Sequence, residues 1–554
     1  MGKSKKSGSN FLVQGSILAF ASIVSRIIGL LYRIPLTNKI GDIGNSYYSS
    51  AFEVYSIMLL ISSYSLPIAV SKLVSTQVAR GKRRMGYQIL KCSLVFAIIS
   101  GLLFALIVFF GAGFFADIYL KTPNCIFALR VLAPAILIVA VLGVIRGFFQ
   151  GLGTMVPSAV SQIIEQIVNA IISVWAAYVL FDYGIKIGNV LGDPAHYSAA
   201  YGAAGGTLGT SMGSVAALLF MVFVFAMYSS TLKRQMLREG KKTIEPMKAT
   251  FRVLIITIIP VLLSTTIYNI SGFIDNGVYK HLAYSLGYAT DEIDVWWGVY
   301  TGKYKLMINV PISIASALAA SSVPALTASF GRGDMKDVRR KLSSSIRFIM
   351  VIAFPCTVGL AVLAKPIFTL LFPGTLDTLE LASNMMYVGA AAVIFYSIST
   401  LSNGLLQGIN RLKVPVVNAA ISLVAHVILL VVLMMGFKMN IYAVVISNMF
   451  FAIMMCILNN IALVRYSGYR QEIIRTFIIP GICSAIMGLA TFLVYKGMYV
   501  LCSNNAASMV VSMIVAVIVY GILMLVFKGL TENEILKFPK GAVLVKIFRK
   551  MKLL

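Results

Sequence analysis

The sequence predicts an all-α protein that crosses a membrane about fourteen times. Hydrophobic residues make up 59% of its 554 residues and charged residues only 12%, whereas soluble domains usually contain about 25% charged residues. The apolar residues also gather in runs of roughly 20 residues or more, the length that a helix needs to cross a bilayer. These two observations together are typical of a polytopic membrane protein.

The apolar runs follow one another along the whole chain and are joined by short polar loops. No loop is long enough to form a soluble catalytic domain. The six cysteines have no C-x-x-C spacing and the three histidines are far apart in the sequence, so neither a disulfide framework, a metal site nor a bound cofactor is predicted. The predicted spans are 11–36, 54–79, 88–116, 126–149, 156–182, 203–229, 250–279, 300–329, 345–371, 383–407, 414–437, 441–464, 474–498 and 506–528.

The distribution of basic residues among the loops predicts the orientation. Every second loop is basic, for example RGKRR at 80–84 and LKRQMLREGKK at 232–242, and both termini belong to this set. The other loops are poor in lysine and arginine. Because basic loops stay on the cytoplasmic side, both termini are expected in the cytoplasm of a plasma-membrane protein. The net charge of +28 then reports orientation and not nucleic-acid binding.

The chain also contains an internal repeat. Tyr55 and Met58 recur as Tyr304 and Met307, an offset of about 250 residues. A Gln-Gly pair followed by a proline recurs further on at the same offset, apart from small insertions. We therefore expect two pseudo-symmetric six-helix bundles in parallel topology, which is the geometry of alternating-access transporters. The expected domains are an N-terminal bundle at 1–235, a second bundle at 245–470, two extra helices at 471–530 and a basic cytoplasmic tail at 531–554.

Two arginines lie inside the first predicted span. Arg26 and Arg33 are seven residues apart, which places them on one helix face, roughly 10 Å apart along the axis. A central arginine costs about 2.5–3.5 kcal/mol on the translocon scale. The helix face that carries Arg26 and Arg33, here called the cationic stripe, is therefore expected to face a protein-lined cavity. The alternative is that the side chains reach toward a headgroup region, which is easier for Arg33, nearer the helix end.

Other charges inside spans are Lys72, Lys303 and Lys305, with the carboxylates of Glu165 and Asp275. We expect the cations to bind an anion such as a phosphate or diphosphate, because guanidinium pairs with phosphate bidentately and ammonium acts as a point charge. The two carboxylates are expected to serve as counter-ions or coupling groups. Internal salt bridges without a ligand are the alternative. Two further charges, Glu53 and Arg146, lie near predicted span ends and are discounted.

Interior prolines suggest where helices bend. Pro67 and Pro311 lie in the paired second and eighth spans, and interior prolines kink helices. They are candidate hinges or, equally, static kinks. The two extra C-terminal helices suggest either a groove for a hydrocarbon tail or added packing and dimerisation.

Several segments resemble one transporter family. SRIIGLLYR at 25–33, LPIAVSKLVS at 66–75, KLMINVP at 305–311 and SSVPALT at 321–327 are similar to the MurJ-type lipid II flippases. These include the Gram-positive stage V sporulation protein B group of polysaccharide biosynthesis proteins, within the multidrug/oligosaccharidyl-lipid/polysaccharide exporter superfamily. The resemblance implies that Arg26, Arg33, Lys305 and Lys72 are essential cations. It also implies an undecaprenyl-tail groove beside the last two helices.

Two departures from the Gram-negative pattern leave the substrate open. The second arginine is one residue further along, and lysine replaces arginine in the second and eighth spans. Lysine keeps the charge but loses the bidentate fork.

The sequence therefore predicts a flippase, not an enzyme, that moves a polyprenyl-diphosphate-linked glycan, with lipid II as first choice. The expected partners are the lipid-linked oligosaccharide, membrane lipids and the cell-wall synthesis machinery. Coupling to the membrane potential or to a monovalent cation is compatible with this plan. The alternatives are another undecaprenyl-linked polysaccharide, cation-coupled multidrug export, a membrane-embedded enzyme, or a structural partner of cell-wall or spore-coat machinery.

Overall fold

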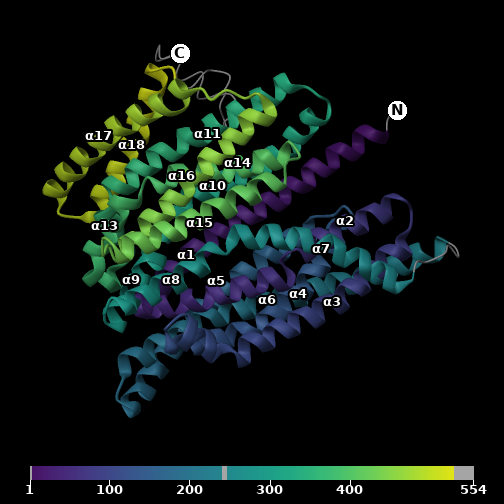
Figure 1. Cartoon of the computed structure of the whole chain (residues 1–554), viewed down its shortest axis with the longest axis horizontal. Helices are drawn as coiled ribbons and strands as arrows, with labels where there is room; N and C mark the ends of the chain where they lie inside the picture. Colours follow the sequence, from purple (N-terminus) through teal and green to yellow (C-terminus); the bar gives the residue numbers. More distant parts are fainter. Residues whose placement is uncertain (1–2, 240–245, 530–554) are drawn as a thin grey trace. The chain divides into compact units, whose positions relative to one another are not determined.

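The structure, a computed structural model, describes residues 3–239 and 246–529 (Figure 1). All secondary structure in this part of the chain is helical. The prediction of an all-helical multi-pass membrane protein is confirmed by long apolar helices, of which eleven can span a bilayer by length and composition. The predicted basic tail at 531–554 lies outside the described residues.

The number of spans differs from the fourteen that the sequence predicts. The described residues contain eleven candidate spans, or twelve if the bent pair Pro373–Gly389 and Ala392–Gly408 counts as one span. One reason is that the predicted spans 11–36 and 54–79 both reach into a single 60-residue candidate stretch, Phe20–Ala79, which counts once although it is broken by a kink at Gly41. Helix α1 runs from Lys3 to Leu59, and only Gly41, with φ 71°, departs from helical geometry inside it. Glycine adopts this left-handed conformation without steric cost.

The chain folds as two compact units. The first comprises the described residues up to Gly302 together with Leu430–Ile441. Its helices are α1, the π-helical turn η1 (Leu60–Tyr64), α2 (Leu66–Ala79), α3 (Arg83–Phe110), η2 (Phe114–Tyr119), η3 (Pro123–Cys125), α4 (Ile126–Gly151), α5 (Val156–Leu191), α6 (Pro194–Arg238), α7 (Met247–Asn269), α8 (Ser271–Ser285) and α9 (Thr290–Val299).

The second unit contains the described residues of Lys303–Leu429 and from Tyr442 onward. The turn η4 (Tyr300–Tyr304) crosses the boundary between the units. The helices that follow are α10 (Lys305–Gly331), α11 (Met335–Val362), α12 (Ala364–Leu371), η5 (Pro373–Thr378), α13 (Leu379–Gly389), α14 (Ala392–Gly408), α15 (Lys413–Met435), α16 (Ile441–Ser467), η6 (Ile474–Ile478), α17 (Ile479–Cys502) and α18 (Asn505–Val526).

Glycines spaced four apart let α6 pack directly on α5. A Cβ on Gly205 would lie 2.5 Å from the Ala176 carbonyl oxygen, and one on Gly209 would collide with Ser173. A Cβ on Gly213 would lie 2.6 Å from the carbonyl oxygen of Glu165. Small residues at this spacing allow the backbones of membrane helices to approach closely. This close packing fixes the position of α5 and of the polar side chains it carries.

The last two helices form a pair on the second unit. Helices α17 and α18 pack on each other, and α17 packs on α11 (Figure 1). Tyr520 of α18 donates a hydrogen bond of 2.8 Å to the Val351 carbonyl. Large apolar side chains such as Leu489 and Val517 are exposed on the pair, as expected for a surface that faces lipid. A groove for a lipid tail at this surface stays a prediction.

Candidate functional site

The first unit contains an open cavity of about 530 Å³. About half of its wall is apolar or aromatic, and the rest consists of amide and hydroxyl groups and one carboxylate, which could orient a bound small molecule. Helices α1, α4, α5, α6 and α7 and the turn η1 contribute to it. The lining residues are Tyr32, Phe52, Tyr55, Ser56, Leu59, Leu60, Tyr64, Val139, Glu165, Gln166, Asn169, Thr210 and Asn269.

The carboxylate of this cavity is paired with an arginine. Arg146 of α4 donates from Nη2 to Glu165 Oε2 at 2.8 Å and from Nε to Ser161 Oγ at 2.8 Å. The Arg146 and Glu165 side chains are only 13% and 20% exposed. Glu165 thus has an internal salt bridge, and its role as a counter-ion or coupling group for the predicted cations stays a prediction. The partner is Arg146, which the sequence analysis discounted because it lies near a predicted span end.

Arg33 lies beside an aromatic ring of the same helix. Its guanidinium carbon is 4.4 Å from the centroid of the Tyr48 ring, a cation–π contact. Arg33 precedes the break at Gly41 and Tyr48 follows it. Within the part of the chain that the structure describes, the Arg33 guanidinium makes no hydrogen bond or ion pair. Its five N–H donors therefore remain available to an anion.

Two other predicted cations are exposed. Arg26 of α1 and Lys72 of α2 have no hydrogen bond, ion pair or ring contact to their side chains among residues 3–239 and 246–529. Neither they nor Arg33 lines the cavity described above. The cations within or near the predicted spans of the first unit therefore differ in their partners. Arg146 has a carboxylate partner, whereas Arg26, Arg33 and Lys72 have none in the described residues.

The other predicted charges are engaged in several ways. Lys303 is 1% exposed and donates to the Thr375 carbonyl at 3.0 Å and to the Thr378 hydroxyl at 2.5 Å. Its ammonium therefore holds the end of the turn η4 against the turn η5. Asp275 is buried in α8, and Lys305 is half-buried at the start of α10. Lys303 and Lys305 belong to the second unit.

The two candidate hinges have different local structures. Pro67 lies in the first turn of α2, directly after the π-helical turn η1, and not inside a continuous helix. A Cβ on Gly147 of α4 would lie 2.6 Å from the Pro67 carbonyl oxygen, so α4 packs closely against this turn. Pro311 lies within α10, which follows the π-helical turn η4. Such turns occur frequently at functional positions, and both hinges stay predictions.

Sequence reasoning missed a buried ion pair in the first unit. The Lys280 ammonium is 2.8 Å from Asp294 Oδ1, and the two side chains are 0% and 3% exposed. Lys280 also donates to the hydroxyls of Ser46, Ser50 and Thr122. The pair was missed because residues 280–299 fall between predicted spans. The run of serines in α1 was the available signal of a buried polar face.

Comparisons with known proteins agree with this architecture. A family model described as polysaccharide biosynthesis protein matches residues 12–330, and a model described as MatE matches residues 306–432. The lipid II flippase MurJ of Bacillus subtilis is 25% identical over 502 residues, which cover 88% of this chain and 89% of that protein. Stage V sporulation protein B of the same bacterium is 28% identical over 341 residues, 62% of each protein.

Solved structures show the same fold at low sequence identity. A structure of the lipid II flippase MurJ in an inward closed conformation has a TM-score of 0.64 and 16% identity, and the match covers 92% of this chain and 98% of that one. An inward-facing multidrug resistance transporter of the MATE family has a TM-score of 0.61 and 15% identity, covering 80% and 96% of the two chains. The fold is therefore MATE/MurJ-like.

Proposed function

Because the chain belongs to the polysaccharide biosynthesis protein family, whose superfamily consists of transporters and not enzymes, we propose that it is a flippase. Its substrate in this proposal is a polyprenyl-diphosphate-linked glycan, with lipid II as first choice. The similarity to two Bacillus subtilis proteins, one a lipid II flippase, supports this choice. Another undecaprenyl-linked polysaccharide remains the alternative substrate.

The observation that carries the proposal is the set of cations that lie within predicted spans and have no carboxylate partner among the described residues. Arg26 and Arg33 lie on one face of α1, because they are seven residues apart in a continuous helix. Among the described residues, no acid neutralises them or Lys72. A charge in the membrane without a protein counter-ion is costly, and a diphosphate would supply the missing negative charge. The guanidinium forks suit its oxygens in particular.

The proposed transport cycle is alternating access. The diphosphate enters from the cytoplasmic leaflet, binds Arg26, Arg33, Lys72 and Lys305, and leaves on the other side while its tail stays in lipid. The bundles at 1–235 and 245–470 rock about bends at Pro67 and Pro311, and α17 and α18 hold the tail. An inside-negative potential would favour outward movement of the anion by about 2.3 kcal/mol per charge per 100 mV if the cations stay in place.

One observation favours a second candidate, cation-coupled export of drugs. Glu165 is the charged residue that lines the cavity in the first unit, and an acidic cavity suits cationic compounds. Its salt bridge with Arg146 lowers the negative charge available to them. Expression of this chain in a drug-sensitive bacterium distinguishes the two candidates, because an exporter raises drug tolerance and a dedicated flippase does not.

Complementation tests the proposal directly. In a bacterium depleted of its own lipid II flippase, expression of this chain should restore the exposure of lipid II on the outer leaflet, measured with a label that cannot cross the membrane. Arg26→Ala should abolish exposure while leaving membrane insertion unchanged. Lys186→Gln serves as the matched control, because Lys186 is an exposed cation of α5 outside the proposed site.

The outcomes separate the parts of the proposal. Full activity in Arg26→Ala would show that the cationic stripe is not needed for flipping. Good membrane expression without any exposure of lipid II would exclude lipid II and direct the search to other undecaprenyl-linked glycans.

A further inference from the structure

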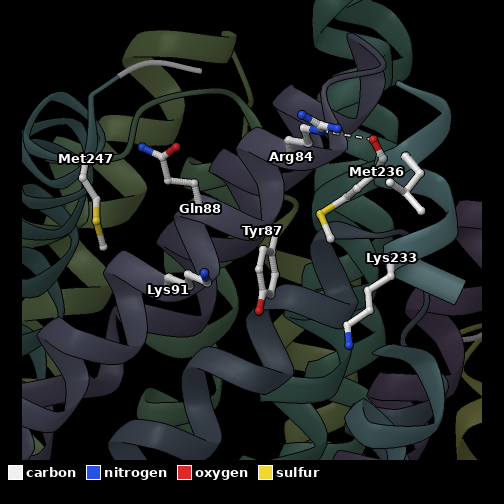
Figure 2. A pocket seen from close by; sticks show the side chains of 8 residues that line it. Arg84, Tyr87, Gln88, Lys91, Lys233, Met236 and Met247 are labelled. Carbon is white, nitrogen blue, oxygen red and sulfur yellow. Dashed lines mark hydrogen bonds between the residues drawn. The ribbon is translucent and has the colours of Figure 1, made fainter. Parts of the chain in front are cut away.

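A second cavity lies in the first unit, away from the one described above. Its volume is about 580 Å³. The first three turns of α3 supply Arg84, Tyr87 and Lys91, the last turns of α6 supply Lys233, and α7 begins beside them (Figure 2). The loops that flank these helix ends belong to the basic set that the sequence places in the cytoplasm. The proposed function does not use this cavity.

The cavity is cationic, and two of its charges have no acidic partner in the described part of the chain. Lys91 Nζ lies 4.8 Å from the centroid of the Tyr87 ring, and the Lys233 side chain makes no hydrogen bond or ion pair with any described residue. Arg84 Nε donates to the Met236 carbonyl at 3.0 Å. The nearby carboxylate of Glu239 accepts a 2.9 Å hydrogen bond from the Arg84 backbone N–H, so it caps α3.

The remaining wall is apolar. Met236, Leu237 and Met247 line the cavity, and Leu237 and Met247 are 74% and 53% exposed. Large apolar side chains this exposed, next to lysines at the ends of membrane-spanning helices, are typical of the boundary between headgroups and acyl chains. The cavity therefore offers positive charge and apolar surface side by side.

We propose that this cavity binds an anionic phospholipid of the inner leaflet, with the phosphate on Lys91, Lys233 and Arg84 and the start of the acyl chains on Met236, Leu237 and Met247. Basic cavities between membrane helices on the cytoplasmic side bind anionic headgroups, each lysine contributing about a fivefold gain in affinity. A soluble phosphate would use the cations but would gain nothing from the apolar wall.

Lipid titration of the purified full-length protein tests this site. Thermal unfolding in a neutral detergent is followed while phosphatidylglycerol, phosphatidylcholine or inorganic phosphate is added. Phosphatidylglycerol should raise the unfolding temperature to a plateau, and the other two should not. Lys91→Gln and Lys233→Gln should each weaken the apparent affinity about fivefold, without changing the unfolding temperature in the absence of lipid, because both side chains are exposed.

Arg234→Gln is the matched control. Arg234 is the exposed neighbour of Lys233 on α6 but does not line the cavity, so its loss should leave the affinity unchanged. An equal loss in Arg234→Gln would show attraction to general surface charge and overturn the proposal. Equal stabilisation by phosphatidylcholine or by inorganic phosphate would overturn it as well, the latter in favour of a soluble anion.

Discussion

Replacing Asp294 by asparagine should destabilise the first unit strongly. Lys280 is fully buried, and its ion pair with Asp294 is 2.8 Å long. Removing one partner of a buried pair costs about 3–5 kcal/mol, because the remaining charge is left uncompensated. The hydroxyls of Ser46, Ser50 and Thr122 still accept hydrogen bonds from Lys280. We therefore expect a loss near the lower end, about 3 kcal/mol.

The assay is a double-mutant cycle on purified protein, followed by thermal unfolding in detergent. Asp294→Asn, Asp294→Leu and Lys280→Met should each lower the unfolding temperature. Lys280→Met combined with Asp294→Leu should recover most of the loss, because an apolar pair of similar volume leaves no buried charge. The exposed pair of Lys365 and Glu380, 4.0 Å apart, is the control. Glu380→Gln should cause no measurable change.

Two results would refute this reasoning. An Asp294→Asn variant as stable as the unmodified protein would mean that Lys280 is hydrated or neutral in the folded state. A double variant that loses the sum of the two single losses would mean that the two charges do not interact.

Two further predictions concern the helices that hold the cavity. Gly209→Leu should destabilise the protein by about 1–3 kcal/mol or prevent insertion, since any Cβ there meets Ser173. Gly497→Leu is the control and should be tolerated, because there is open space where its Cβ would lie. Equal thermal stability of the two variants would contradict the packing argument. Glu165→Gln should reduce both stability and lipid-linked substrate export, because it leaves Arg146 unpaired in the membrane. Exchanging the two charges should restore stability measured by unfolding, and no recovery would indicate that Glu165 acts through contacts other than the pair.

Much of the architecture follows from composition and periodicity. The apolar runs predicted a helical multi-pass protein, since only a helix satisfies its backbone in lipid without a closed barrel. The spacing of Arg26 and Arg33 predicted a shared helix face, and α1 is continuous across both. Glu165 forms an internal salt bridge with Arg146, the alternative that the sequence left open for the interior carboxylates. Each of these predictions depends on local spacing or on the cost of a lone charge.

The rest depends on tertiary contacts or on one backbone conformation. A φ of 71° at Gly41 breaks the helical stretch Lys3–Leu59 into two helices, and hydropathy does not report backbone angles. Arg146 was discounted as a functional charge because it lies near a predicted span end. Its partner Glu165 is nineteen residues away on another helix, so the pair becomes visible only in the folded structure. Lys280 and Asp294 lie outside the predicted spans, and their burial depends on α1, far away in the sequence.

That burial also bears on how the chain is made. Ser46 precedes Lys280 by 234 residues, so the serine face of α1 leaves the ribosome long before the segment that needs it. Lys280 and Asp294 are stable in their buried positions only with these partners, because burying an ion costs several kcal/mol. The α8–α9 hairpin is therefore expected to enter its final position only after α1 has been inserted, which gives the membrane-insertion machinery a fixed order of assembly for this unit.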